Sequence, residues 1–180
     1  MIKDLQLIIT GGTIDSEWDP LKEPDATIPH GRVTPRSKSG IAPYLKQYIK
    51  PDITIYENVV ALIDSRDMTD EILDRVFQGI QNSKSNNIIV THGTDTVAVT
   101  ARRLQKLITK GGELCSKKII CLGAFFPLLC GSPSDAPFNL GFAIAAFANI
   151  APGVYVAMNG QVFDPDHVEK DFEKARFMLK

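Results

Sequence analysis

Two apolar runs that end at glycine constrain the fold of this chain most. Residues 5–9 are Leu-Gln-Leu-Ile-Ile and precede Thr-Gly-Gly-Thr at 10–13, while residues 88–91 are Ile-Ile-Val-Thr and precede His-Gly-Thr at 92–94. A short run rich in Leu, Ile and Val that stops at glycine is typical of a buried strand ending in a sharp turn. We therefore expect two strands of a covered, parallel sheet, each ending in a glycine–threonine corner.

A helix is predicted after the second corner. Apolar residues recur there every three or four positions, at Val97, Ala101, Leu104 and Ile108. Thr94 and Asp95 then precede the helix N-terminus, where free N–H groups and the positive dipole end favour an anion or a developing oxyanion. Because the carboxyl ends of parallel strands meet at one edge of a sheet, the two corners are expected to share a pocket.

The rest of the chain alternates between strand and helix patterns. Strands are predicted at 53–60, 119–122 and 154–158, and helices after Ser39, after Thr69 and over 137–150. Asn159-Gly160 predicts a hairpin, and the tail from Asp166 is expected to be helical. This alternation predicts an α/β domain with a mainly parallel sheet flanked by helices.

One long segment lacks any periodicity. Residues 14–36 are polar and contain several prolines. A stretch of this length inside a domain is either a functional lid or a disordered segment, and both interpretations stay open from the sequence.

Composition excludes several classes of function. The formal net charge of −1 at pH 7 gives no basic face for nucleic acid or for an acidic membrane surface. No apolar window could span a bilayer, and the N-terminal run lacks the flanks of a signal peptide. The chain has three cysteines, an odd number without metal-site spacing, which fits a reducing compartment. We expect a cytoplasmic protein that acts on a small molecule without a metal.

Six short motifs point to a family. They occur in one order along the chain, at residues 10–14, 64–68, 92–96, 123–124, 135–140 and 158–159. In this order they resemble the motifs of the bacterial-type L-asparaginases. The resemblance implies a three-layer, flavodoxin- or Rossmann-like N-terminal domain that needs no cofactor. The smaller C-terminal domain of those enzymes has no counterpart here, so residues 1–180 are expected to form a single domain.

The resemblance also assigns catalytic residues. Thr13 matches the threonine that attacks a side-chain amide, forms an acyl-enzyme and releases ammonia. Thr94, Asp95 and Lys170 match a second constellation that activates the nucleophile. A threonine hydroxyl needs such help because it is a poor nucleophile at its own pKa. A lysine serves as a base only where its surroundings lower its pKa; burial would do this and Asp95 would oppose it.

Substrate contacts follow from the same matches. Ser65 matches the residue that binds the substrate α-carboxylate, and Asp95 would also hold the α-ammonium. Gly12, Gly93 and Ala124 match positions that offer backbone contacts, and backbone N–H groups at the glycine corners would meet the oxyanion. Arg66 fits either an ion pair with a neighbouring aspartate or a contact with the substrate carboxylate. His92 is expected to be structural.

Departures from the family pattern lie beside the site. Ala26 stands where the lid of those enzymes supplies a tyrosine, and Trp18 is either a substitute for it or a residue packed on the surface. The apolar segment 125–130 replaces a more polar stretch and is a candidate subunit interface of an expected dimer or tetramer. Two other functions therefore stay open: a module that binds a small amino acid without turnover, and a subunit of an amidotransferase.

Overall fold

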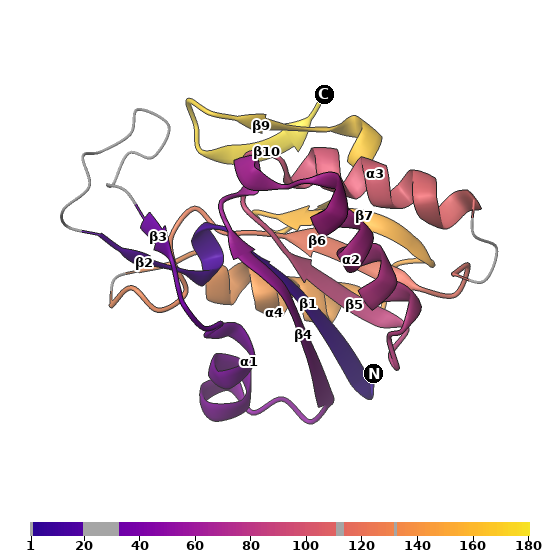
Figure 1. Cartoon of the computed structure of the whole chain (residues 1–180), viewed down its shortest axis with the longest axis horizontal. Coiled ribbons are helices and arrows are strands. Elements are labelled where there is room, and N and C mark those ends of the chain that lie inside the picture. Colours follow the sequence, from indigo (N-terminus) through magenta and orange to yellow (C-terminus); the bar gives the residue numbers. More distant parts are fainter. Residues whose placement is uncertain (1, 20–32, 111–113, 132) are drawn as a thin grey trace.

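A six-stranded sheet forms the centre of the computed structural model, which describes residues 2–19, 33–110, 114–131 and 133–180. The spatial order of its strands is β4 (Thr54–Ile63), β1 (Asp4–Gly11), β5 (Asn87–Thr91), β6 (Lys118–Leu122), β7 (Gly153–Met158) and β8 (Gln161–Phe163). The first five are parallel, and only β8 runs antiparallel to its neighbour. The predicted α/β class with a mainly parallel sheet is confirmed (Figure 1).

The chain changes direction across the sheet at β1. This strand pairs with β4 on one side and with β5 on the other, so that Leu7 is in register with both Glu57 and Ile89. In an open parallel sheet, a ligand usually binds in the crevice beyond the carboxyl ends of the strands at which the chain changes direction, here β1 and β5. The two glycine–threonine corners lie at these two strand ends, as the sequence predicts.

Helices cover both faces of the sheet. On one face α2 (Asp70–Gln81) and α3 (Val97–Lys110) bury Val76, Ile80, Val97 and Leu104 against Ile8 of β1. On the other, α1 (Ile41–Tyr44) with the π-helical turn η2 (Leu45–Ile49) and α4 (Ala136–Ala146) pack on Leu7 and Ile9. Successive residues of β1 therefore point into two different cores, which explains its continuous apolar run.

Local signals place the helix ends. Thr69 precedes α2, and its hydroxyl accepts a hydrogen bond from the backbone N–H of Ile72 at 3.3 Å. Asp70 and Glu71 lie in the first turn, where they complement the helix dipole. At the predicted hairpin, Asn159 and Gly160 both have positive φ, 52° and 75°, as the two-residue turn between β7 and β8 requires.

The tail is not helical, so this prediction is wrong. After the short turn η4 (Pro165–His167), the strands β9 (Val168–Asp171) and β10 (Arg176–Leu179) form an antiparallel hairpin above α3 (Figure 1). Val168 and Phe177 bury their side chains in the α3-side core, with 1% and 3% of their surface exposed. Val168 is buried and Glu169 is exposed, as on a strand with one covered face, and the dense charge of the segment hides this pattern in the sequence.

The non-periodic segment has structured ends. After the turn η1 (Thr13–Asp15), β2 (Ser16–Trp18) pairs antiparallel with β3 (Val33–Pro35). The Trp18 ring packs edge-on against Phe126, with 6.4 Å between centroids, which agrees with the surface-packing interpretation of Trp18. Ala26 lies outside the described residues. Within the described part of the chain, no helix is long and apolar enough to cross a membrane.

Candidate active site

Three strand-end loops meet at the carboxyl edge of the sheet, and glycine makes the meeting possible. Gly12 has φ of 79°, and a Cβ built on it would overlap the backbone of His92 and Gly93. A Cβ on Gly93 would lie 2.6 Å from the Cβ of Ser65. The loops after β1, β5 and β4 therefore touch through main chain and one serine, as a shared pocket requires.

Thr13 stands immediately beyond this contact. It opens the turn η1 and is half-buried. The N–H of Gly12 donates to the carbonyl of Ile63 at 2.8 Å, and the Gly12 carbonyl accepts from Ser16 Oγ at 2.8 Å. The N–H of Gly12 is therefore already hydrogen-bonded within the fold. Within the described residues the Thr13 hydroxyl makes no hydrogen bond, so the loop around it is fixed while the hydroxyl stays available.

The structure brings Thr94, Asp95 and Lys170 together from distant parts of the sequence. Lys170 Nζ donates to Thr94 Oγ1 at 2.9 Å and to Asp95 Oδ1 at 2.5 Å, across 76 and 75 residues of chain. The Lys170 side chain is 8% exposed and that of Asp95 is 28% exposed. A lysine that sequence composition would place in solvent is thus enclosed beside a threonine hydroxyl.

The C-terminal hairpin delivers this lysine. Lys170 lies on β9 opposite Phe177 of β10. The backbone N–H of Phe177 donates to Asn159 Oδ1 at 2.9 Å, and the N–H of Asn159 donates to Asn139 Oδ1 at 3.3 Å. Arg102 of α3 also donates to the carbonyl of Pro165 at 2.8 Å, just before the hairpin. The hairpin is therefore tied to the β7–β8 turn, which α4 holds in place, and the turn η4 before the hairpin is tied to α3.

Ser65 and Arg66 lie in the short turn η3 (Ser65–Asp67). Ser65 is buried beside Gly93, and its carbonyl accepts from Thr96 Oγ1 at 2.8 Å. The Arg66 guanidinium instead pairs with Asp64 through Nε at 2.9 Å and a terminal nitrogen at 3.1 Å. This pair holds the pKa of the Asp64 carboxyl below its usual range. Of the two interpretations of Arg66, the structure therefore contains the ion pair with a neighbouring aspartate.

Ala124 is buried in the loop after β6, and α4 holds that loop in place. The carboxylate of Asp135 accepts from the backbone N–H groups of Phe125 and Phe126, both at 3.0 Å. Asn139 donates its side-chain amide to the carbonyl of Gly123 at 3.1 Å. The sequence placed Asp135, Asn139 and Asn159 in family motifs, and Asn159 also in a hairpin turn, but it assigned none of them a role in the site. The available signal was their position as polar residues at the ends of apolar elements.

His92 is a structural residue. Its ring is fully buried, with Nδ1 2.9 Å from the Gly93 carbonyl and Nε2 2.9 Å from Thr100 Oγ1. Burial lowers the pKa of this imidazole, which therefore stays neutral at physiological pH. Both ring nitrogens are engaged within the fold, and the histidine links the second corner to α3.

The apolar segment 125–130 is not the exposed surface that its sequence suggests. Leu128 is only 8% exposed and belongs to the core on the α4 side, and its N–H donates to the carbonyl of Ile14 at 3.0 Å. Leu129 is 40% exposed. Leu128 therefore packs inward, in the core that also contains Ile14, while an interface over the rest of the segment stays a prediction.

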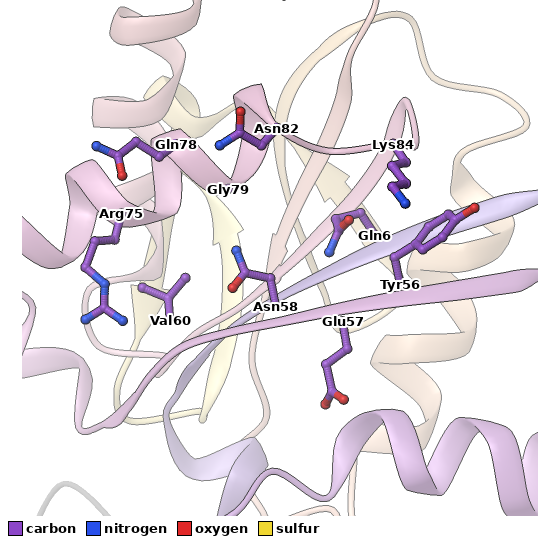
Figure 2. A pocket seen from close by; sticks show the side chains of 10 residues that line it. All are labelled: Gln6, Tyr56, Glu57, Asn58, Val60, Arg75, Gln78, Gly79, Asn82 and Lys84. Carbon is purple, nitrogen blue, oxygen red and sulfur yellow. The ribbon is translucent and has the colours of Figure 1, made fainter.

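A cavity lies away from these residues. With a volume of about 450 Å³, it opens between α2 and the strands β4 and β1, and the side-chain amides of Asn58, Gln78 and Asn82 are part of its lining. Figure 2 shows Asn58 pointing toward α2 at Gly79, where a Cβ would lie 2.7 Å from the Asn58 amide nitrogen. None of the predicted site residues lines this cavity. No cluster of His, Cys, Asp or Glu in the described ranges could hold a metal ion.

Comparisons with known proteins agree with the motifs. A family model described as the N-terminal part of asparaginase matches residues 4–177. L-asparaginase 2 of Escherichia coli is 30% identical over 174 residues, which are 94% of this chain and 47% of that protein. A relative in Haemophilus influenzae, named as a probable periplasmic L-asparaginase, is 33% identical over 116 residues, which are 62% of this chain and 32% of that protein.

A solved structure shows the same fold. The probable cytoplasmic L-asparaginase of Campylobacter jejuni superposes with a TM-score of 0.70 at 26% identity, over 99% of this chain and 53% of that one. The chain thus spans about half the length of that protein and of the Escherichia coli relative. On the extent of the family match and the shared fold, this chain belongs to the asparaginase family.

Proposed function

We propose that this chain hydrolyses the side-chain amide of L-asparagine or of a related small amide, with Thr13 as the nucleophile. The observation that carries the proposal is the contact of Lys170 Nζ with Thr94 Oγ1 and Asp95 Oδ1 beside the touching corners at Gly12 and Gly93. The Escherichia coli and Haemophilus influenzae relatives carry the name L-asparaginase, which supports the choice of substrate class.

The reaction proceeds in two acyl-transfer steps. The Thr13 hydroxyl attacks the amide carbon, and its proton passes through the Thr94 hydroxyl to Lys170 Nζ, which accepts it in the unprotonated amine form. The tetrahedral intermediate carries its charge on the former carbonyl oxygen, where backbone N–H groups of the corners stabilise it. Collapse breaks the carbon–nitrogen bond, and the leaving nitrogen takes a proton and departs as ammonia. Water then attacks the acyl-Thr13 ester, which releases the free acid and restores the hydroxyl.

The α-carboxylate and α-ammonium of the substrate have binding partners at the same carboxyl edge of the sheet. Ser65 binds the α-carboxylate, and the Asp95 carboxylate, whose side chain is 28% exposed, holds the α-ammonium. The main chain at Gly93 and Ala124 completes the contacts. Arg66 adds positive charge at the rim, although its guanidinium is paired with Asp64.

An ammonia-release assay tests this proposal. The purified chain is given asparagine, glutamine and several short amides, beside Thr13→Ala, Thr94→Val and Lys170→Met. The matched control is Thr54→Ala, an exposed threonine at the opposite end of the sheet. We expect ammonia from the wild type and the control, and a loss of at least about 100-fold in the three site variants, as for removal of a nucleophile or its activator.

Two outcomes would contradict the proposal. Absence of ammonia from every amide would exclude the activity, and calorimetric binding of aspartate in that case would assign the pocket to a binding module. Ammonia release that survives in Thr13→Ala would remove Thr13 from the role of nucleophile.

Assembly and location extend the proposal. Large apolar side chains of η2 and α4 are exposed, among them Tyr48 at 65% and Phe138 at 59%, and such surfaces mark contacts between subunits. We assign the chain to a homo-oligomer in the cytoplasm, a reducing compartment that suits a chain with an odd number of cysteines. Light scattering that gives the monomer mass would contradict the first assignment. Recovery of the chain from a periplasmic extract would contradict the second.

A further inference from the structure

Lys170 has aromatic neighbours as well as oxygen partners. Its Nζ lies 5.2 Å from the ring centroid of Phe125 and 4.7 Å from that of Phe172. The same atom donates to Thr94 and Asp95. A cation this close to the face of an aromatic ring is attracted by the ring quadrupole, and the ring also excludes water from it. Two oxygens and two rings therefore surround one ammonium group.

The two rings come from elements that are fixed in different ways. Phe125 follows β6, and its backbone N–H donates to Asp135 at 3.0 Å. Its ring also packs against Phe177, which pairs with Lys170 across the hairpin. Phe172 follows β9 directly and is 57% exposed. The first ring is thus anchored in the main domain, and the second closes over the lysine from the hairpin side.

Burial in a core does not account for the place of Phe172. More than half of its surface faces solvent, yet the lysine beside it is enclosed, with 8% of the side chain exposed. A long lysine side chain has many rotamers, and a hydroxyl alone does not select one of them. A ring on each side restricts the stem and leaves the ammonium group facing Thr94.

We propose that Phe125 and Phe172 are positioning residues, a clamp that holds Lys170 Nζ against the Thr94 hydroxyl. The catalytic meaning of the clamp rests on the proposed function; its physical existence does not. Because the clamp acts through ring faces, tryptophan at position 172 retains it, whereas leucine keeps an apolar side chain and abolishes it.

A labelling experiment tests the clamp without any turnover. Reductive methylation of lysines, followed by mass spectrometry of peptides, compares the wild type with Phe172→Leu, Phe172→Trp and the control Phe138→Leu, which removes another exposed ring. We expect Lys170 to react several-fold faster in Phe172→Leu and at the wild-type rate in the other two. Lys84, which lies 5.7 Å from the Tyr56 ring, serves as the internal reference and reacts equally in all four proteins. Equal Lys170 rates in the wild type and Phe172→Leu, at unchanged melting temperature, would overturn the clamp.

Kinetics then connect the clamp to catalysis. In Phe172→Leu we expect kcat for ammonia release to fall more than KM changes, because Lys170 contacts Thr94 directly and would reach the substrate α-ammonium only through Asp95. Phe172→Trp restores kcat. A change in KM with an unaltered kcat would contradict the positioning role. If the wild type releases no ammonia, the proposed function fails while the labelling rates still decide whether the clamp exists.

Discussion

At the scale of single residues, the candidate site depends on two glycines, which have no side chain. Gly93 lies against Ser65 and Gly12 lies against Gly93, so the absence of two Cβ atoms allows the strand ends to meet. Polar side chains then act at the edge of this contact, from Thr13 on one loop and Thr94 on the other. The glycines thus contribute to the candidate site because they have no side chain that would hold the loops apart.

Gly93→Ala tests this close approach. Its Cβ would lie 2.6 Å from Ser65 Cβ, so we expect the free energy of unfolding to fall by about 1–3 kcal/mol, the usual cost of overpacking. Urea denaturation measures the change. Gly141→Ala is the control, since its Cβ would meet nothing within 4 Å on α4; a helical alanine there should stabilise the chain by about 0.5–1 kcal/mol. Equal effects of the two substitutions would contradict the packing.

His92 makes stability depend on pH. Burial lowers its pKa in the folded state below the ordinary 6.5, so the unfolded chain takes up a proton first as the pH falls. The stability that the neutral ring contributes is therefore present above about pH 6.5 and decreases below it, by up to about 1.4 kcal/mol per pH unit. Chemical denaturation at pH 7.5 and 5.5 should show a larger decrease for the wild type than for His92→Gln. Equal decreases in the two proteins would exclude His92 as the source.

At the scale of elements, strands and helices with long apolar patterns were predictable, and the tail was not. The runs before both corners and the i, i+3, i+4 pattern of α3 arise from burial on nearby faces, which sequence periodicity reports directly. The β9–β10 hairpin buries only alternate side chains, such as Val168, and Lys170 is one of those turned inward. A charged residue in an inward position breaks the pattern that would reveal the strand.

The site was predictable in part for a related reason. Motif order identified Thr13, Thr94, Asp95 and Lys170 as candidates, but spacing along the chain does not encode a contact across 76 residues. Nor does it show that Asn159 anchors the hairpin, because an Asn-Gly pair already has a sufficient explanation as a turn. Tertiary contacts of this kind are visible only in the structure.

Asn159 should control the hairpin that carries Lys170. Asn159→Gly keeps the positive φ and removes the hydrogen bond to Phe177, at a cost of about 1 kcal/mol. Asn159→Ala also strains the left-handed backbone and should cost about 1–2 kcal/mol more. Melting temperatures rank the two variants, and both should release ammonia more slowly than the wild type. A wild-type rate in Asn159→Gly would show that the other ties of the hairpin suffice.

At the scale of the whole molecule, two cores on opposite faces of one sheet support the same edge. The α3-side core contains Phe177 and so holds the lysine hairpin, while the α4-side core contains Ile14 and Leu128 and so holds the Thr13 loop. Damage to either core should therefore disturb the site as well as global stability.

Leu128→Asp and Leu129→Asp distinguish core from surface. The first buries a carboxylate in the α4-side core and should cost about 3–5 kcal/mol or prevent folding, whereas the second alters a side chain that is 40% exposed and should change stability by less than about 1 kcal/mol. Circular dichroism melting and elution volume measure both effects. A folded Leu128→Asp protein that only dissociates would instead place Leu128 in a subunit interface.

The meeting of the two corners has one more consequence. Side chains adjust to their neighbours by changing rotamer, but main chain pressed on main chain has no such freedom. The spacing between the loop of Thr13 and the loop of Thr94 is therefore set by the backbone of the sheet itself. Substitutions on surrounding loops would alter which molecules reach this edge, and they would leave the distance between the two loops almost unchanged.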